Sequence, residues 1–113
     1  MTGTDIHIHS GLISDCRKGS RKAQFRIYNL YSKAMFNVAC RILKNREEAE
    51  DMLQEAFTDC FRNIDTYRSE STFGAWLKTI VINKCINRLR KRDTELVYVD
   101  DYMPLESPEE DPP

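Results

Sequence analysis

The chain has 113 residues, the size of one domain, with 41% hydrophobic residues, 31% charged residues and a formal net charge of −1. Four glycines and four prolines are too few for a protein of many tight turns or for a low-complexity polymer. No apolar run approaches the roughly 20 residues of a membrane span, and the start has no signal-peptide pattern, so we expect a soluble cytoplasmic domain.

The charges are unevenly distributed along the chain. From Asp93 to the end there are eight acidic residues and no Lys or Arg, whereas residues 1–92 hold all 17 basic residues and have a balance of +7. A basic body followed by an acidic segment is typical of a domain that binds a polyanion. The alternative is that the asymmetry reflects only a solvated acidic tail.

In chain order, residues 1–10 are predicted to be a flexible polar arm. A short helix is then expected over Leu12–Arg17, ended by Gly19, and a long helix from a Ser20 N-cap to about Leu43. The apolar stripe predicted for this long helix consists of Phe25, Tyr28, Tyr31, Met35, Val38, Ala39 and Ile42.

The next helix has the clearest pattern. Asn45 followed by Glu48 is typical of a capping box, and the acidic residues of the next turn favour a helix N-terminus. Its apolar positions recur at three and four without a break: Ala49, Met52, Leu53, Ala56, Phe57, Cys60, Phe61 and Ile64. Residues 65–70 are predicted to be a connecting loop.

Ser71 or Thr72 is expected to cap a final helix that ends near Arg92. The Pro-rich acidic segment from Asp93 onward is predicted to be a linker or a disordered tail. Three substantial helices and a short one, without any strand pattern, predict an all-α fold, a compact bundle of three to four helices.

Metal binding and catalysis find little support in the sequence. His7, His9 and Cys16 make an incomplete ligand set, so we predict no metal site. There is no Gly-rich phosphate loop or zinc-protease motif, and the body has no histidine, so we predict that the chain is not an enzyme. The four cysteines, expected to be free thiols because no C-x-x-C pair occurs, are Cys16, Cys40, Cys60 and Cys85.

The final helix presents three stripes. Two are apolar, the first with Phe73, Leu77, Ile80 and Val81 and the second with Ile82, Cys85 and Leu89. The third, spread over about 80° by the helical period, consists of Trp76, Thr79, Asn83, Asn87 and Arg90. The end of the helix then carries five basic residues with no acid among them: Lys84, Arg88, Arg90, Lys91 and Arg92.

This combination indicates single-stranded nucleic acid. Phosphates give like charges a reason to cluster, and base faces can stack on Trp76 and on the loop aromatic Tyr67. Plainer interpretations exist for each feature: Trp76 as core, Asn83 and Asn87 as capping or solvated amides, and the basic run as cations at a helix C-terminus.

The segment from Asn45 to Arg92 resembles region 2 of bacterial RNA polymerase sigma factors of the extracytoplasmic-function (ECF) group. The family's acidic helix reads approximately D/E-A-E-D-L/I-x-Q-E-x-F, and here the sequence is EAEDMLQEAF over residues 48–57. The family's next helix reads F-x-x-W-L-x-x-I-A-x-N, matched by Phe73, Trp76, Leu77, Ile80 and Asn83, with Val81 in place of the usual alanine. Including the helix before them, the resemblance covers about residues 10–92.

The resemblance implies two binding surfaces and no cofactor. By position, Asp51, Gln54 and Glu55 match residues that dock on the clamp coiled coil of the β′ subunit of core RNA polymerase. The loop residues Tyr67, Arg68, Ser69, Glu70 and Ser71, together with Asn83, match a pocket for a base flipped from the non-template strand of the promoter minus-ten element. We expect the DNA surface also to include Trp76, Thr79, Lys84, Asn87, Arg88 and Lys91. An anti-sigma factor is a further expected partner.

The resemblance also implies a division of the chain. Residues 11–92 are expected to form the region 2 domain and residues 93–113 an acidic Pro-rich linker, with the second, region 4, domain absent. An alternative function is a protein-interaction bundle that binds polymerase or an anti-sigma protein without reading DNA. A helix-turn-helix regulator of duplex DNA is less compatible, because the loop over residues 65–70 lacks Gly and follows a long helix.

Overall fold

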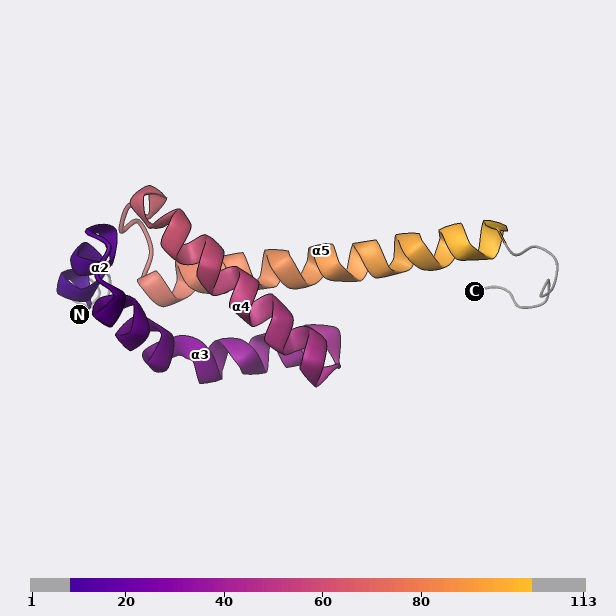
Figure 1. Cartoon of the computed structure of the whole chain (residues 1–113), viewed down its shortest axis with the longest axis horizontal. Coiled ribbons are helices and arrows are strands. Elements are labelled where there is room, and N and C mark those ends of the chain that lie inside the picture. Colours follow the sequence, from indigo (N-terminus) through magenta and orange to yellow (C-terminus); the bar gives the residue numbers. More distant parts are fainter. Residues whose placement is uncertain (1–8, 103–113) are drawn as a thin grey trace.

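The computed structural model describes residues 9–102, with side-chain surroundings as far as Glu95. Within this range the elements are α2 (Ser10–Arg17), α3 (Arg21–Leu43), α4 (Arg46–Arg62), the 3-10 turn η1 (Ile64–Thr66) and α5 (Phe73–Tyr102) (Figure 1). No strand occurs in these residues, so the prediction of an all-α bundle is confirmed. None of these helices has both the length and the hydropathy that crossing a membrane requires.

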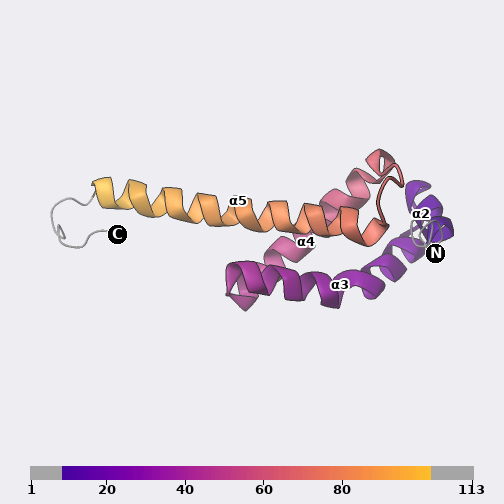
Figure 2. The ribbon, with the colours of Figure 1, turned by 180° about the vertical axis from the view of Figure 1, so that it is seen from behind.

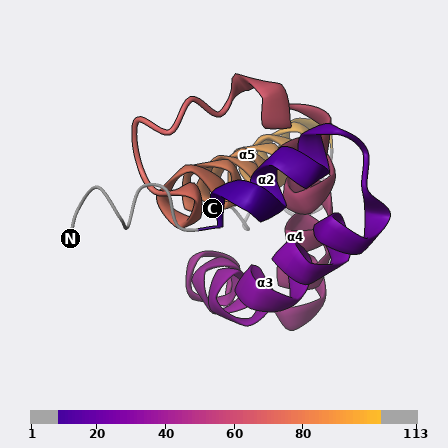
Figure 3. The same cartoon turned by 90° about the vertical axis from the view of Figure 1, so that its left-hand side faces the viewer.

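The three long helices form the body. They run up, down and up in chain order, and each packs against the other two (Figures 1 and 2). The short helix α2 lies at one end, where it packs against α3 and η1, as the end-on view in Figure 3 shows. The short helix and the turn therefore close the end of the bundle at which the loop to α5 is located.

Each long helix begins at a side-chain cap. Ser20 Oγ accepts a hydrogen bond from the Ala23 amide at 3.1 Å, as predicted. Asn45 Oδ1 likewise accepts from the amide of Glu48 at 2.9 Å, so the predicted cap of α4 is confirmed. At the start of α5 it is Thr72, rather than Ser71, whose hydroxyl accepts from the third residue along, at 3.1 Å.

The core confirms the prediction for α4 and corrects one residue of the prediction for α3. The other six predicted positions of α3 pack in or against the core: Tyr28, Tyr31, Met35, Val38, Ala39 and Ile42. All eight apolar positions predicted for the α4 region pack in the core, with only Phe61 partly exposed. On α3, Phe25 was expected to be in the core but is 65% exposed. Phe25 lies about 200° around the helix from the buried Ile27, so the inward stripe is the one that includes Ile27. The buried residues of α3 are Ala23, Ile27, Met35, Ala39 and Leu43.

On α5, the two predicted apolar faces are one winding stripe. Phe73, Leu77, Val81 and Cys85 follow one another at intervals of four residues, and each is 0% exposed. Four residues turn an α-helix by about 40° past a full circle, so the stripe winds slowly around α5 as it crosses α3 and α4. Cys85 therefore continues the first stripe instead of opening a second.

The prediction that the last helix ends near Arg92 is wrong, because α5 continues to Tyr102. No Gly or Pro occurs between Gly74 and Pro104, so nothing in this stretch breaks the helix. The helix projects past the other three (Figure 1), and the molecule measures 59 × 28 × 22 Å. Its radius of gyration is 18.4 Å, against about 13 Å for a compact chain of this length. The predicted arm, with His7, and the rest of the predicted tail lie largely outside the described residues.

Candidate functional site

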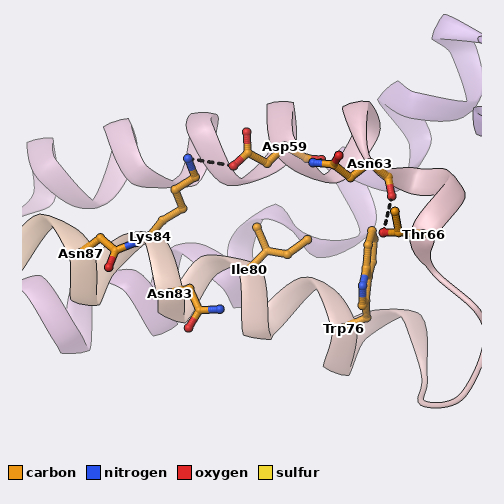
Figure 4. Close-up of a pocket in the computed structure, with 8 residues that line it drawn as sticks. All are labelled: Asp59, Asn63, Thr66, Trp76, Ile80, Asn83, Lys84 and Asn87. Carbon is orange, nitrogen blue, oxygen red and sulfur yellow. Dashed lines mark hydrogen bonds and ion pairs between the residues drawn. The ribbon is translucent and has the colours of Figure 1, made fainter.

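An open pocket of about 400 Å³ lies between the end of α4, η1 and the first turns of α5 (Figure 4). Four predicted DNA-binding residues contribute to it, all from α5: Trp76, Asn83, Lys84 and Asn87. The other lining residues are Asp59, Asn63, Thr66 and Ile80. The pocket combines an aromatic ring, an aliphatic side chain, amides, a hydroxyl and one ion pair, which suits a flat polar ring such as a base.

Trp76 forms one end of the pocket. Its ring packs 5.2 Å from the ring of Tyr67 and 5.5 Å from that of Phe73, measured between centroids. The residue is only half-buried, and its indole stands beside Thr66 at the pocket wall (Figure 4). Trp76 is therefore both part of the aromatic core and part of the pocket surface, so both sequence interpretations of this residue apply.

The polar groups of the pocket fall into two sets. Those near η1 are engaged: Asn63 Nδ2 donates to the Asp59 carbonyl at 3.0 Å, and the Thr66 hydroxyl donates to the Asn63 carbonyl at 2.7 Å. Those on α5 are different, because Asn83 and Asn87 are exposed and neither amide has a hydrogen-bond partner among the described residues. Each free amide offers a donor and an acceptor to an incoming group.

Lys84 crosses from α5 to α4. Its ammonium lies 2.8 Å from Asp59 Oδ2 and 3.6 Å from Glu55 Oε1, and Figure 4 shows the bridge to Asp59. The hydrogen bond to Asp59 raises the pKa of Lys84 above its ordinary value of 10.5, although partial burial opposes the shift. Lys84 is thus charged but paired with carboxylates in this structure, whereas the sequence predicted a lysine free to contact a phosphate.

Tyr67 does not have the exposed face that the sequence predicted, and this expectation is wrong. Its ring is only 3% exposed and meets Phe73 edge-on at 5.4 Å. The Tyr67 hydroxyl donates to the Ser71 carbonyl at 2.6 Å, which ties the two ends of the loop together. A tyrosine ring packs well in a core when its hydroxyl finds a hydrogen-bond partner, and a local sequence pattern does not show whether such a partner is within reach.

The rest of the predicted loop is at the surface. Arg68, Glu70 and Ser71 are exposed. Ser69 is half-buried and has a left-handed backbone with a φ of 61°. This backbone conformation is strained for a residue other than glycine. The surrounding structure must therefore hold the loop in the sharp turn at Ser69.

The basic end of α5 is only partly free. Arg92 pairs with the Glu48 carboxylate on α4. Arg88 is half-buried and Lys91 is exposed, and among the described residues neither forms an ion pair. Thr79 is exposed, and its hydroxyl donates to the carbonyl one turn back in the helix at 3.1 Å.

The second predicted surface lies on α4. Asp51, Gln54 and Glu55 are all exposed, and their spacing places them on one face of the helix. Gln54 Nε2 donates to the hydroxyl of Tyr28 on α3 at 3.1 Å, which orients the amide. Since Glu55 also contacts Lys84, this face and the pocket share one ion-pair cluster.

The contribution of α4 and η1 to the pocket was not predicted from the sequence. Asp59 lies one turn after Glu55, so helical periodicity places it on the same exposed face. Asn63 and Thr66 had no comparable signal, because their approach to α5 depends on how the helices pack.

The described residues hold no cluster of three or more His, Cys, Asp or Glu side chains suited to a metal ion. All four cysteines are free, and three of them are buried. Burial raises the pKa of the Cys60 thiol to about 12, which suppresses its reactivity.

The structure is a small helical domain with a polar pocket beside a basic helix end and an acidic face on α4. The chain belongs to the Sigma-70 region 2 family, whose model matches residues 27–95. This membership confirms the resemblance seen in the sequence and the prediction that the chain is not an enzyme.

Individual relatives agree with this family. Over 88 residues the chain is 35% identical to the ECF RNA polymerase sigma factor SigW of Bacillus subtilis (strain 168), covering 78% of this chain and 46% of that protein. It is 30% identical over 81 residues to the RNA polymerase sigma-H factor of Pseudomonas aeruginosa, covering 72% and 42%. It is also 30% identical over 78 residues to the ECF RNA polymerase sigma-E factor of Escherichia coli (strain K12), covering 69% and 40%. The chain thus spans less than half the length of these curated relatives.

Proposed function

We propose that this domain acts in transcription initiation in the cytoplasm, as the part of an ECF sigma factor that binds core RNA polymerase and captures an unpaired promoter base. The names of its relatives support the class of function. The observation that carries the DNA-reading part is the pocket, which Trp76 lines at one end and the free amides of Asn83 and Asn87 line further along α5.

The pocket suits an extruded base of the minus-ten element on the non-template strand. An unpaired base has two faces that stack on an aromatic ring and an edge that pairs with an amide. Asn83 has both a donor and an acceptor for that edge. Arg88 and Lys91 lie further along the same helix, where they can contact the phosphates of the strand that enters the pocket.

The test compares Asn83→Ala with Arg88→Ala in competition binding of short single-stranded oligonucleotides that differ at one base. We expect Asn83→Ala to change the preference for one base by about tenfold, because a lost edge contact discriminates among bases. Arg88→Ala is expected to weaken all sequences alike and to lower the salt dependence by about 0.7, the value of one phosphate contact on a single strand.

If both variants weaken every oligonucleotide by the same factor, Asn83 does not read a base. If the wild-type chain shows no preference for single strands over duplex, the alternative function is favoured, a bundle that binds polymerase or an anti-sigma factor without reading DNA.

We further propose that Asp51, Gln54 and Glu55 form the face that docks on the β′ clamp coiled coil. Carboxylates presented on an exposed helix face can accept paired hydrogen bonds from arginines of a partner. Asp51 is the better residue to change, because Glu55 also contacts Lys84. Asp51→Lys is expected to weaken binding to core polymerase at least tenfold by placing like charges opposite each other.

The matched control is Asp15→Lys, the same charge change at an exposed site on α2, at the other end of the bundle. The affinity of each variant for core polymerase can be compared by pull-down or by biolayer interferometry. Equal binding by the two variants would contradict the assignment of this face.

A further inference from the structure

The loop that follows η1 is held by a side chain that lies about fifty residues earlier in the sequence. We propose that Arg17, on α2, is a positioning residue for this loop and thereby for the base preference of the pocket, an inference that rests on the proposed function. Arg17 does not line the pocket, so any effect it has on base preference acts through the loop.

The contact joins α2 to the two ends of η1. Arg17 Nη2 donates to the Tyr67 carbonyl at 2.5 Å, and Nε donates to the Ile64 carbonyl at 3.4 Å. A guanidinium is a rigid planar fork, so two bonds from one group fix both the distance and the orientation of the peptide units they reach. A lysine in its place has one ammonium, which does not reproduce the fork.

Tyr67 transmits this constraint to the pocket. Its hydroxyl donates to the Ser71 carbonyl, so the residue held by Arg17 also holds the far end of the loop. Its ring packs against Trp76 at 5.2 Å, and Trp76 is a wall of the pocket. A shift of the Tyr67 backbone therefore moves the loop over residues 68–71 and the indole together.

Helix α2, which carries Arg17, is itself held in place by packing in the core. Ile13 and Cys16 are 4% and 3% exposed, and Gly19, with a φ of 89°, makes the turn into α3. Arg17 itself is exposed, so water competes for its donors. We therefore expect its loss to loosen the loop without unfolding the domain.

The experiment uses the full 113-residue chain and three variants. Arg17→Met removes the fork and keeps an apolar stem, whereas Lys18→Met makes the same charge change at the neighbouring exposed residue. Arg17→Lys retains the charge without the fork. Trp76 is the only tryptophan, so acrylamide quenching of its fluorescence reports directly on the packing beside Tyr67.

We expect Arg17→Met to increase quenching of Trp76 and to reduce the ratio of affinities for the best and worst single-base oligonucleotides by up to roughly tenfold, because a loosened pocket can lose at most the discrimination of the base contact that it positions. Lys18→Met should weaken all oligonucleotides alike and leave both the ratio and the quenching unchanged. Arg17→Lys should fall between wild type and Arg17→Met in both measurements.

Equal quenching and equal affinity ratios for Arg17→Met and Lys18→Met would overturn the proposal. If the wild-type chain binds no oligonucleotide, the proposed function fails and the link to base preference fails with it. The quenching comparison still decides, in that case, whether Arg17 positions the loop.

Discussion

Replacing Asp59 by Asn should strengthen the binding of single-stranded oligonucleotides. In this structure the Lys84 ammonium lies 2.8 Å from the Asp59 carboxylate, which neutralises a cation at the edge of the pocket. With an amide at position 59, only Glu55, at 3.6 Å, remains as a carboxylate partner. Lys84 then keeps one longer ion pair in place of two, which leaves its ammonium more available to a phosphate.

The size of the effect follows from counterion release. One additional phosphate contact adds about 0.7 to the slope of log affinity against log salt for a single strand. Between 50 and 200 mM salt, this slope makes the affinity of the variant fall by about 2.6-fold more than that of wild type. The stability cost should stay below about 1 kcal/mol, because both side chains of the pair are partly exposed.

The assay is fluorescence anisotropy of a labelled oligonucleotide at several salt concentrations, with Asp51→Asn as the control. Asp51 is exposed on the same helix and loses the same charge, but it contacts no cation among the described residues. A salt slope for Asp59→Asn equal to that of Asp51→Asn would refute the reasoning, because it would show that only net charge had changed.

Alkaline unfolding provides an independent check on the pair. Since Asp59 raises the pKa of Lys84, the stabilisation is fully present below the ordinary value of 10.5 and is lost as pH rises through the higher value of the folded state. The difference in the free energy of unfolding between wild type and Asp59→Asn should therefore be constant near neutral pH and disappear in strong alkali.

Two further predictions concern stability and reactivity. Lys44 ends α3 with a φ of 56°, so Lys44→Gly should raise the free energy of unfolding by roughly 1 kcal/mol in urea titrations, whereas Lys18→Gly, at a φ of −84°, should not. In timed thiol labelling, the half-buried Cys40 should react first, and Cys60, fully buried with a pKa of about 12, should react only on global unfolding; early labelling of Cys60 would contradict its burial.

The sequence predicted well what neighbouring residues decide. The caps at Ser20 and Asn45 and the stripe of α4 depend on spacings of three and four, and the structure confirms them. Phe25 and Tyr67 were placed wrongly because their burial depends on distant elements. Arg17, for example, binds the Tyr67 backbone across 50 residues of sequence, a contact that no local pattern contains.

The same distinction applies to the pocket. Trp76, Asn83 and Asn87 belong to the polar stripe that the helical period predicted for α5, and all three line the pocket. Lys84 was expected in the basic run beside that stripe, and Thr79 and Arg90, which were expected in the stripe, are not among the lining residues. Asp59, on the facing helix, was missed. The partner of a charged side chain across a helix pair depends on crossing geometry and register, which the sequence does not display. Because of that geometry, Lys84 is paired with Asp59 in the structure, although the sequence predicted a free cation.

Because α5 continues from Asp93 to Tyr102, position 102 has a fixed distance and orientation relative to the helical bundle. These ten residues extend the helix by about 15 Å, and each turns the azimuth of the next by about 100°. In a flexible connection, by contrast, the orientation of a residue relative to the bundle would no longer be fixed after a few residues. Deleting one residue here would swing a probe attached at position 102 through more than a quarter of a circle, whereas deleting seven would shorten the arm by about 10 Å and nearly restore its bearing.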